Sequence, residues 1–274
     1  MDGPVTHPLV ERTHCAVSVV MPCFNAATTI ERAVESIAGQ ALAPLEVIAV
    51  DDASVDGTAA VLDRLSRRSW PFTFHVVALP ENRGPGEARN AGLERVSSGA
   101  EYVAFQDADD VWLPWKLERQ IGWMDRHPDC DWTAHRCGVL GRDDRQSDVR
   151  GDLAAEPITR RGLLFRNAVA TPAVVARRTL PGRFRLAWRH CEDLMLWVDW
   201  LDGGHAGFML EETMVCLGRR PRSPGGITGD LGAMHRGEQR VLSTLVSERR
   251  MGRGIAWLWA AYARVRYLIR LARS

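Results

Sequence analysis

Apolar residues in the first 110 positions follow two alternating patterns. Short apolar runs, each typical of a buried strand, cover residues 16–21, 45–50, 72–79 and 102–105. Helical spacing or helix-start signals occupy the intervals at residues 27–40, 56–68 and 84–96. Thr28 or Thr29 is the expected cap of the first helix. This alternation, at roughly 30-residue spacing, predicts an α/β fold with a doubly wound, mostly parallel central sheet flanked by helices.

The pattern is less regular after residue 110. We expect helices over residues 114–124 and 193–201, and strands over 131–140, 168–176 and 208–217. Residues 142–156 and 219–232 are polar or rich in Gly, Pro and Arg, which predicts surface loops. Two closing helices are expected over about 234–248 and 255–272.

Carboxylates follow two of the predicted strands. Asp51 and Asp52 end the second strand, and Asp107, Asp109 and Asp110 follow the fourth. Parallel sheets bind ligands at the carboxyl ends of their strands, so both clusters should lie on one edge. Because such carboxylates repel one another, and because Mg²⁺ and Mn²⁺ prefer oxygen ligands, the second cluster is a candidate cation site. The alternative for this cluster taken alone is a solvated acidic turn.

Five segments in series carry a resemblance. They are Val17–Asn25, Val47–Thr58, Gly84–Gly92, Phe105–Asp110 and Asp109–Glu118. In this order they resemble the inverting family 2 glycosyltransferases, which have the GT-A fold and show P-x-[YF]-N, V-D-D-x-S-x-D-G-T, G-x-x-x-A-R-N-x-G and D-x-D motifs. The clear resemblance covers about residues 16–126.

The resemblance implies roles for the matching residues. Pro22 and Asn25 would line the nucleotide pocket, and Asp52 would accept a hydrogen bond from the base, commonly uracil. The other implied contacts with the nucleotide sugar are those of Arg89, Asp107 and Ala108. Asp107 and Asp109 would hold Mn²⁺ or Mg²⁺, which stabilises the leaving nucleoside diphosphate. The donor favoured by Asp52 is a UDP- or dTDP-sugar.

The second half should supply the acceptor side. The family places its catalytic base in an E-D pair at a helix start, and here Asp193 fits as the base with Glu192 as a neighbour that orients the acceptor. The alternative for Asp193 is a helix-capping carboxylate. Arg219, Arg220 and Arg222 are candidate lid residues that contact the diphosphate, or else a solvated basic loop. His235 is a candidate third metal ligand.

The resulting division has four parts. Residues 1–14 would be a flexible leader, 15–126 the nucleotide-sugar-binding half, 127–232 the acceptor and catalytic-base half of the same domain, and 233–274 the C-terminal helices. The expected function is metal-dependent, inverting transfer of a sugar to an acceptor hydroxyl of a carbohydrate or lipid-linked molecule, in polysaccharide or glycoconjugate synthesis. The alternatives are a non-catalytic nucleotide-sugar-binding protein and a nucleotidyltransferase. A nucleotidyltransferase would usually have a Gly- and Lys-rich phosphate loop near the first strand, and residues 22–29 contain neither Gly nor Lys.

Composition narrows the partners and the compartment. The formal net charge of +1 argues against a nucleic-acid binder with a basic footprint. Six cysteines without a C-x-x-C pair indicate buried thiols in a reducing compartment. No signal peptide and no apolar run of membrane-spanning length is visible, so the expected location is cytoplasmic.

The last helix leaves two interpretations open. Its apolar stripe is formed by Ile255, Leu258, Tyr262, Val265, Ile269 and Ala272, with arginines mostly off the stripe. Residues 255–273 could lie on an anionic membrane at its inner face, or pack on the protein or on a second subunit. Packing is the favoured interpretation, and a homo-oligomer stays open.

Overall fold

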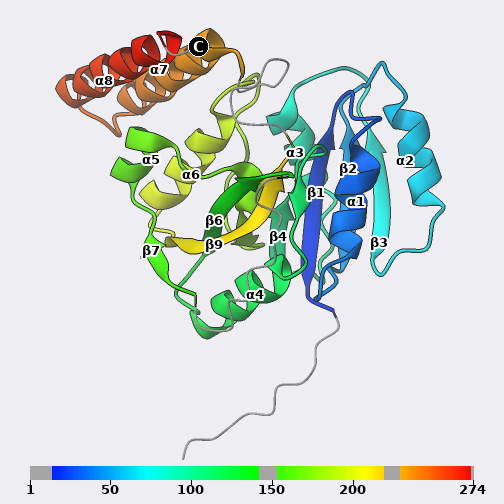
Figure 1. The fold of residues 1–274 in the computed structure, drawn as a ribbon. Helices are drawn as coiled ribbons and strands as arrows, with labels where there is room; N and C mark the ends of the chain where they lie inside the picture. The colour runs from blue at the N-terminus through cyan, green and yellow to red at the C-terminus, as the bar shows by residue number, and fades with distance from the viewer. Residues whose placement is uncertain (1–13, 142–152, 219–228, 273–274) are drawn as a thin grey trace, which may run out of the picture.

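The four early apolar runs form neighbouring parallel strands in the computed structural model, which describes residues 14–141, 153–218 and 229–272. They are β1 (Val17–Cys23), β2 (Glu46–Asp51), β3 (Thr73–Ala78) and β4 (Tyr102–Phe105), in the order β3-β2-β1-β4 (Figure 1). Every described side chain of β2 is buried, as expected for a strand covered on both faces. The predicted doubly wound α/β sheet is confirmed.

Helices cover both faces of these strands. Helices α1 (Ile30–Ala38) and α2 (Thr58–Ser66) pack with the side of β1 that carries Val17, Val19 and Met21. Helix α3 (Pro85–Leu93) packs on the opposite side, where a Cβ at Gly92 would lie 2.5 Å from Val20 Cγ1. Thr29 is the N-cap residue of α1, as predicted, but its side chain makes no capping hydrogen bond. Its hydroxyl donates instead to the Ala26 carbonyl, 3.3 Å away.

The second half extends the sheet with mixed strand directions. Its described elements are β5 (Val111–Trp112), α4 (Lys116–Arg126), β6 (Trp132–Val139), β7 (Ala155–Pro157), α5 (Arg160–Arg166), a 3₁₀ turn (Thr171–Ala173), β8 (Val175–Arg177), α6 (Glu192–Asp202) and β9 (Gly207–Leu217). The full order is β3-β2-β1-β4-β8-β6-β9-β5, with β7 on β9. Strand β8 is antiparallel to both β4 and β6.

The predicted elements of this half need correction in two respects. The strand predicted over 168–176 is a 3₁₀ turn followed by β8, because Pro172 at the second turn position lacks the N–H that a ladder needs. The short elements β5, β7 and α5 were not predicted, since two to seven residues show no readable periodicity. The other predicted strands and helices are present with ends shifted by a few residues.

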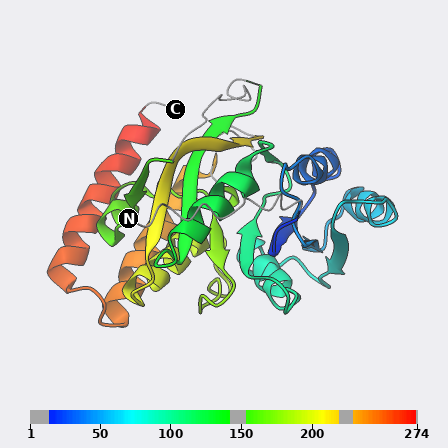
Figure 2. The same cartoon turned by 90° about the horizontal axis from the view of Figure 1, so that it is seen from below.

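The chain closes with the hairpin of α7 (Leu231–Ser247) and α8 (Arg253–Leu271). Figure 2 shows this hairpin at the end of the molecule opposite α1 and α2. Helix α8 packs on α7 through Ala256 and Ala263, its two buried side chains. The helix therefore packs on the protein through its other face, whereas Ile255, Leu258 and Val265 of the predicted stripe are exposed. Contact of the stripe with a second subunit or a membrane stays a prediction. Small alanines on the other face let the helices approach closely, and the large residues cannot enter that contact.

Several sequence-based expectations concern residues outside those that the structure describes. They are the leader, except for His14, most of the loop at 142–156, and residues 219–228 with Arg219, Arg220 and Arg222. All six cysteines are described and none of them forms a disulfide; Cys137 is half-buried and the other five are buried. Among the described helices, none is long and apolar enough to cross a membrane.

Candidate active site

Two loops at the carboxyl ends of β1 and β2 hold each other in place. Asn25 Oδ1 accepts a hydrogen bond from Val55 N (3.0 Å), and Asn25 N donates to Ser54 Oγ (3.0 Å). Asn25 adopts φ 49°, a left-handed conformation that asparagine tolerates better than most residues. Pro22 lies one residue before the end of β1, opposite Val50. The structure thus places Pro22 and Asn25 beside the end of β2, as the predicted nucleotide pocket requires.

Asp52 lies directly after β2 and is buried. Its Oδ1 accepts from Arg83 N and its Oδ2 from Gly84 N, both at 2.8 Å, at the start of α3. Burial raises the pKa of Asp52, and these two backbone donors oppose the shift. A carboxylate offers about four acceptor positions, so two bonds leave capacity for the predicted contact with a base N–H.

The three carboxylates after β4 divide into two kinds. Asp107 and Asp109 are partly exposed, with Ala108 buried between them. Asp110 is buried, and its Oδ1 accepts from Gly218 N (2.9 Å), directly after β9. A Cβ at Gly218 would lie 1.8 Å from the Asp109 carbonyl oxygen, so only glycine fits this approach. Asp110 therefore fastens Gly218, the residue after β9, to the acidic cluster.

The electrostatics of this cluster suit a bound cation. Burial raises the pKa of Asp110 to about 8, and the charges of Asp107 and Asp109 add to the shift. No group of three or more His, Cys, Asp and Glu side chains within the described ranges is arranged as a complete metal cage. Mg²⁺ and its relatives often use only one or two carboxylates, with phosphate oxygens filling the remaining positions. Asp107 and Asp109 fit that arrangement.

Arg89 of α3 joins the two predicted halves of the site. Arg89 is 4% exposed; its Nη2 donates to Asp107 Oδ1 at 2.7 Å, and its Nη1 donates to Glu192 Oε1 at 3.1 Å. Burial alone would lower the pKa of Arg89, but the charges of Asp107 and Glu192 raise it above its usual value. The residues predicted for donor and acceptor binding are thus brought together through one buried cation.

Glu192 and Asp193 form the first turn of α6, after Cys191 in a left-handed conformation (φ 60°). Burial raises the pKa of Glu192 to about 7; Asp193 adds to the shift and Arg89 opposes it. Burial also raises the pKa of Asp193. Unlike Glu192, the Asp193 side chain is partly exposed, and its Oδ2 accepts from Thr171 Oγ1 at 3.4 Å. The residue before α6 is Cys191, so Asp193 is not its N-cap, although Asp193 Oδ1 accepts from Leu194 N (2.7 Å) in the first turn, as a helix-capping carboxylate does.

Four further residues shape the site, although no role was assigned to them from the sequence: Gly86, Asn90, Thr171 and Phe184. Asn90 and Phe184 exchange two hydrogen bonds, Asn90 Nδ2 to Phe184 O at 2.8 Å and Phe184 N to Asn90 Oδ1 at 3.0 Å. The ring of Phe184 lies 5.3 Å from the Arg89 guanidinium carbon. A Cβ at Gly86 would lie 3.0 Å from Glu192 Cγ. Asn90 and Gly86 belong to the G-x-x-x-A-R-N-x-G segment, which was the available signal; nothing near Phe184 or Thr171 marked them.

Other predicted residues lie elsewhere. His235 stacks on Tyr267 of α8, with ring centroids 4.7 Å apart, and no described contact joins it to Asp107 or Asp109. The candidate lid arginines Arg219, Arg220 and Arg222 are outside the described residues.

Comparisons with known proteins agree with this geometry. The family model for glycosyl transferase family 2 matches residues 18–179. A putative teichuronic acid biosynthesis glycosyltransferase of Bacillus subtilis, TuaG, is 32% identical over 199 residues, which cover 72% of this chain and 77% of that protein. An Escherichia coli UDP-Glc:α-D-GlcNAc-diphosphoundecaprenol β-1,3-glucosyltransferase, WfgD, is 31% identical over 182 residues, covering 66% and 68%.

A solved structure shows the same fold. The mannosyltransferase PcManGT of Pyrobaculum calidifontis, in complex with GDP-Man and Mn²⁺, superposes with a TM-score of 0.64 at 18% identity. The alignment covers 94% of this chain and 75% of that one. The GT-A fold therefore extends from the motif-bearing half into the second half of the chain.

Proposed function

Because this chain belongs to glycosyl transferase family 2 and is a glycosyltransferase, we propose that it transfers a sugar from a UDP-sugar to an acceptor hydroxyl with inversion, assisted by a divalent cation. The observation that carries the proposal is the buried Arg89, which holds Asp107 and Glu192 at 2.7 and 3.1 Å. Arg89 connects Glu192 to Asp107 of the candidate diphosphate site. The candidate base, Asp193, is the next residue after Glu192.

Asp193 is the proposed base. Glu192 is ion-paired and buried, whereas Asp193 is partly exposed and can reach an acceptor. The raised pKa of Asp193 strengthens it as a base, since a carboxylate that holds its proton more tightly removes one more readily. Its Oδ2 takes the proton of the acceptor hydroxyl while that oxygen bonds to the anomeric carbon and the bond from this carbon to the phosphate oxygen breaks. The buried Glu192 serves to hold Arg89, and through it Asp107.

The proposed donor side uses the loops after β1, β2 and β4. Asn25 and Asp52 bind the nucleoside, and Asp107 contacts the sugar diphosphate. A cation at Asp107 and Asp109 would offset the negative charge that develops on the departing UDP. Mn²⁺ in the complex of the archaeal mannosyltransferase and UDP-Glc in the name of the bacterial glucosyltransferase support this choice of cofactor and donor.

The acceptor class rests on the named relatives. One is a putative teichuronic acid enzyme and another acts on a sugar linked through a diphosphate to undecaprenol. We therefore propose a carbohydrate or lipid-linked acceptor in polysaccharide or glycoconjugate synthesis. The alternative of a binding protein without chemistry gains nothing from the structure, because binding alone has no use for a partly exposed carboxylate of raised pKa at Asp193.

Calorimetric titration of UDP and GDP, with and without Mn²⁺, tests the site. We expect UDP to bind in a Mn²⁺-dependent manner, Asp109→Ala to weaken that binding roughly tenfold or more, and Asp193→Ala to leave it unchanged. Sugar transfer from a UDP-sugar should fall by about 10²- to 10⁴-fold in Asp193→Ala. Binding that ignores both Mn²⁺ and Asp109→Ala, or unchanged transfer in Asp193→Ala, would contradict the assignment.

A further inference from the structure

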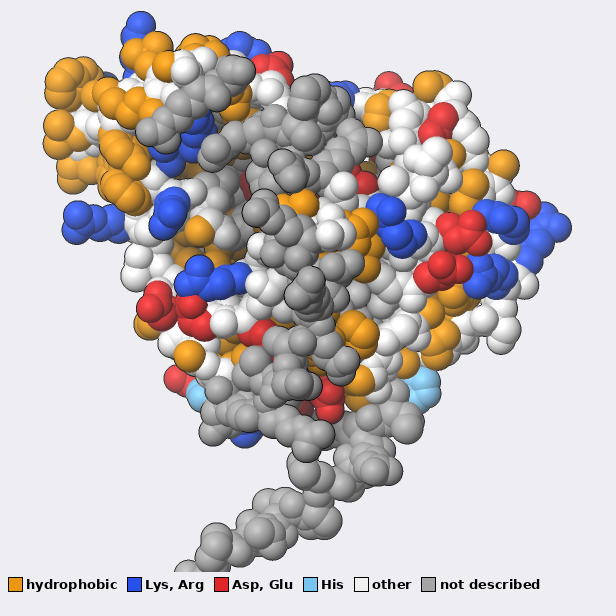
Figure 3. Space-filling view, viewed as in Figure 1, with side chains coloured by type: hydrophobic (Ala, Val, Ile, Leu, Met, Phe, Trp, Pro, Cys, Tyr) orange, Lys and Arg blue, Asp and Glu red, His pale blue; other side chains and the backbone are white. Residues whose placement is uncertain are grey.

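One face of α8 carries large apolar side chains that the described protein leaves exposed. They are Ile255, Trp257, Leu258, Val265, Leu268, Ile269 and Leu271, between 45% and 70% exposed. Figure 3 shows hydrophobic side chains gathered over α8 at the upper left of the molecule. Contiguous apolar surface of this kind marks an interaction site more often than chance exposure. We call these seven residues the apolar face of α8.

The charged residues of the C-terminal segment that contains α8 have one sign. After Glu248 the sequence contains no Asp or Glu, and its charged residues are Arg249, Arg250, Arg253, Arg264, Arg266, Arg270 and Arg273. Arg253 and Arg264 are exposed and form no ion pair within the part of the chain that the structure describes. Eleven residues apart, they differ by only about 20° around the helix, so they form a basic border along one side.

A neighbouring helix continues the same surface. Phe165 of α5 is 49% exposed and stacks on Tyr262 of α8, with ring centroids 4.7 Å apart. Arg266 donates to the Phe165 carbonyl at 2.5 Å, which fixes α5 against α8. Arg166, the next residue, is exposed. The surface therefore has an aromatic extension with its own arginine on the side of α8 away from Arg253.

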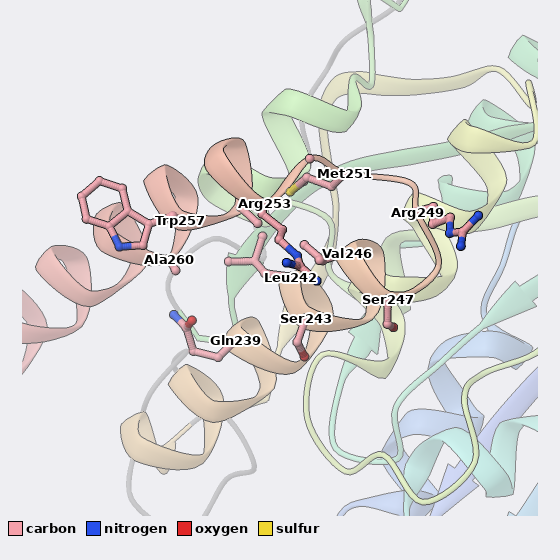
Figure 4. A pocket seen from close by; sticks show the side chains of 12 residues that line it. Gln239, Leu242, Ser243, Val246, Ser247, Arg249, Met251, Arg253, Trp257 and Ala260 are labelled. Carbon is pink, nitrogen blue, oxygen red and sulfur yellow. The ribbon is translucent and has the colours of Figure 1, made fainter.

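A groove of about 850 Å³ runs between α7 and α8, away from the Arg89 site (Figure 4). Its lining combines apolar side chains, such as Leu242, Val246 and Met251, with Arg249 and Arg253. Trp257 belongs both to this groove and to the apolar face. Apolar walls beside guanidinium groups suit an amphipathic molecule with an anionic head, because arginine binds phosphate through paired hydrogen bonds.

From these observations we infer that α8 lies on an anionic lipid bilayer, with its apolar face in the headgroup–acyl boundary and Arg253 and Arg264 at the phosphates. Helices with one apolar and aromatic face and a basic border bind membranes in this way. A second copy of the chain is disfavoured as occupant. A two-fold contact would place the arginine borders of two α8 helices together with no acidic residue on either helix to pair with them.

Docking through α8 would hold the acceptor side of the site near the membrane. Helix α7 packs beside the start of α6. Cys191 Sγ donates to Met234 O of α7 at 3.8 Å, and a Cβ at Gly237 of α7 would lie 3.0 Å from Cys191 Sγ. Cys191 directly precedes Glu192 and Asp193. The hairpin is thus attached to the helix that carries the proposed base.

Sedimentation with lipid vesicles tests the inference on the full chain. We expect binding to vesicles that contain phosphatidylglycerol, roughly tenfold or more weaker binding to pure phosphatidylcholine, and release by high salt. Trp257→Ser/Leu268→Ser should reduce binding to the anionic vesicles by about tenfold or more, because it removes apolar area from the face. Arg253→Glu/Arg264→Glu should do the same by reversing the border charge.

Matched variants at the far end of the molecule serve as controls. Leu45→Ser/Val76→Ser removes two apolar side chains that are 38% and 41% exposed, Leu45 just before β2 and Val76 on β3. Arg67→Glu/Arg95→Glu makes the same charge change as the α8 variant at two other exposed arginines. Both should bind vesicles like the wild type, and thermal melting should confirm that every variant is folded. Wild-type protein that does not bind anionic vesicles, or α8 variants that bind like their controls, would overturn the inference. A dimer abolished by Trp257→Ser/Leu268→Ser, without vesicle binding, would assign the face to a second copy.

Discussion

The donor side and the acceptor side of this site are assembled in different ways. On the donor side Asn25, Asp52 and Asp107 follow three neighbouring parallel strands, so each is placed by the sheet itself. On the acceptor side, Glu192 and Asp193 begin a helix whose position depends on contacts with a segment about 100 residues earlier. Strand ends position the first group, and tertiary contacts with α3 position the second.

Two of the buried polar junctions between the two halves differ in character. The first is ionic, with Arg89 between Asp107 and Glu192. The second is a chain of side-chain hydrogen bonds: Lys116 Nζ to Gln120 Oε1 at 2.7 Å, and Gln120 Nε2 to Thr133 Oγ1 at 3.0 Å. The first lies at the proposed site, and the second lies in the interior. Disturbing the first should therefore affect transfer, whereas disturbing the second should affect only stability.

The largest effect is expected for Arg89→Met. Removing the cation leaves Glu192 buried beside Asp193 without its partner, which should cost about 3–5 kcal/mol in the free energy of unfolding. Transfer should fall by roughly 10²-fold or more, because both carboxylates lose their positions. Denaturant titration and kcat/KM measure the two losses.

Arg89→Lys is the matched control for charge. A lysine keeps the positive charge but cannot donate to two carboxylates from a planar fork, so stability should recover more than transfer does. If Arg89→Lys restored transfer fully, charge and not the bridging geometry would be the important property, and the comparison between the two sides would fail.

A smaller effect is expected for Gly86→Ala, which probes the distance between α3 and α6. The added Cβ would lie 3.0 Å from Glu192 Cγ and 3.2 Å from Phe184 Cβ, so the acceptor side must shift by a few tenths of an ångström. We expect kcat to fall by about three- to tenfold while UDP affinity stays within about twofold, since a small misplacement costs rate. Steady-state kinetics and calorimetry separate the two.

Gly122→Ala gives the corresponding control, because its added Cβ would have only Arg126 Nη1 within 4 Å, at 3.7 Å, within α4. This variant should keep full activity and gain up to about 1 kcal/mol of stability from the lower chain entropy of alanine. A loss of UDP affinity in Gly86→Ala equal to its loss of kcat would show that the donor side is not independent of α3 packing.

The smallest effect concerns the interior junction and its pH dependence. Burial lowers the pKa of Lys116, the only lysine in the sequence, to about 7. Between about pH 7 and the unfolded pKa of about 10.4, the unfolded chain binds the proton and the folded chain does not, so the free energy of unfolding rises with pH. Lys116→Met should lack this contribution.

From pH 7 to pH 9, the free energy of unfolding of the wild type should therefore rise by on the order of 2 kcal/mol relative to that of Lys116→Met. Denaturant unfolding at the two pH values measures it, and the ionisation of other groups cancels in the difference. Transfer at pH 7 should be unchanged. A difference that stays constant with pH would mean that the Lys116 amine is charged in the folded protein throughout this range.

Much of the donor side could be predicted from sequence because its signals are local. A buried parallel strand is a continuous apolar run, and the polar residue that ends it must lie at the ligand-binding edge. Asp52, Asp107 and Asp109 were placed by that rule. Asp110 carries the same charge as Asp109, yet its Oδ1 accepts from Gly218 N at the end of β9, the strand paired with β5. No local pattern distinguishes a carboxylate that faces a ligand from one that fastens the backbone.

The sequence by itself determined the parallel half of the sheet, the strand ends that carry the acidic residues, and the family to which the motifs belong. Only the tertiary structure decided that Arg89 joins Asp107 to Glu192, that Phe184 and Thr171 complete the surroundings, and which face of α8 stays exposed. The physical reason is range. Strand and helix periodicity is written over a few residues, whereas a buried ion pair or a helix contact depends on side chains that are far apart in the chain and meet only when the core is packed.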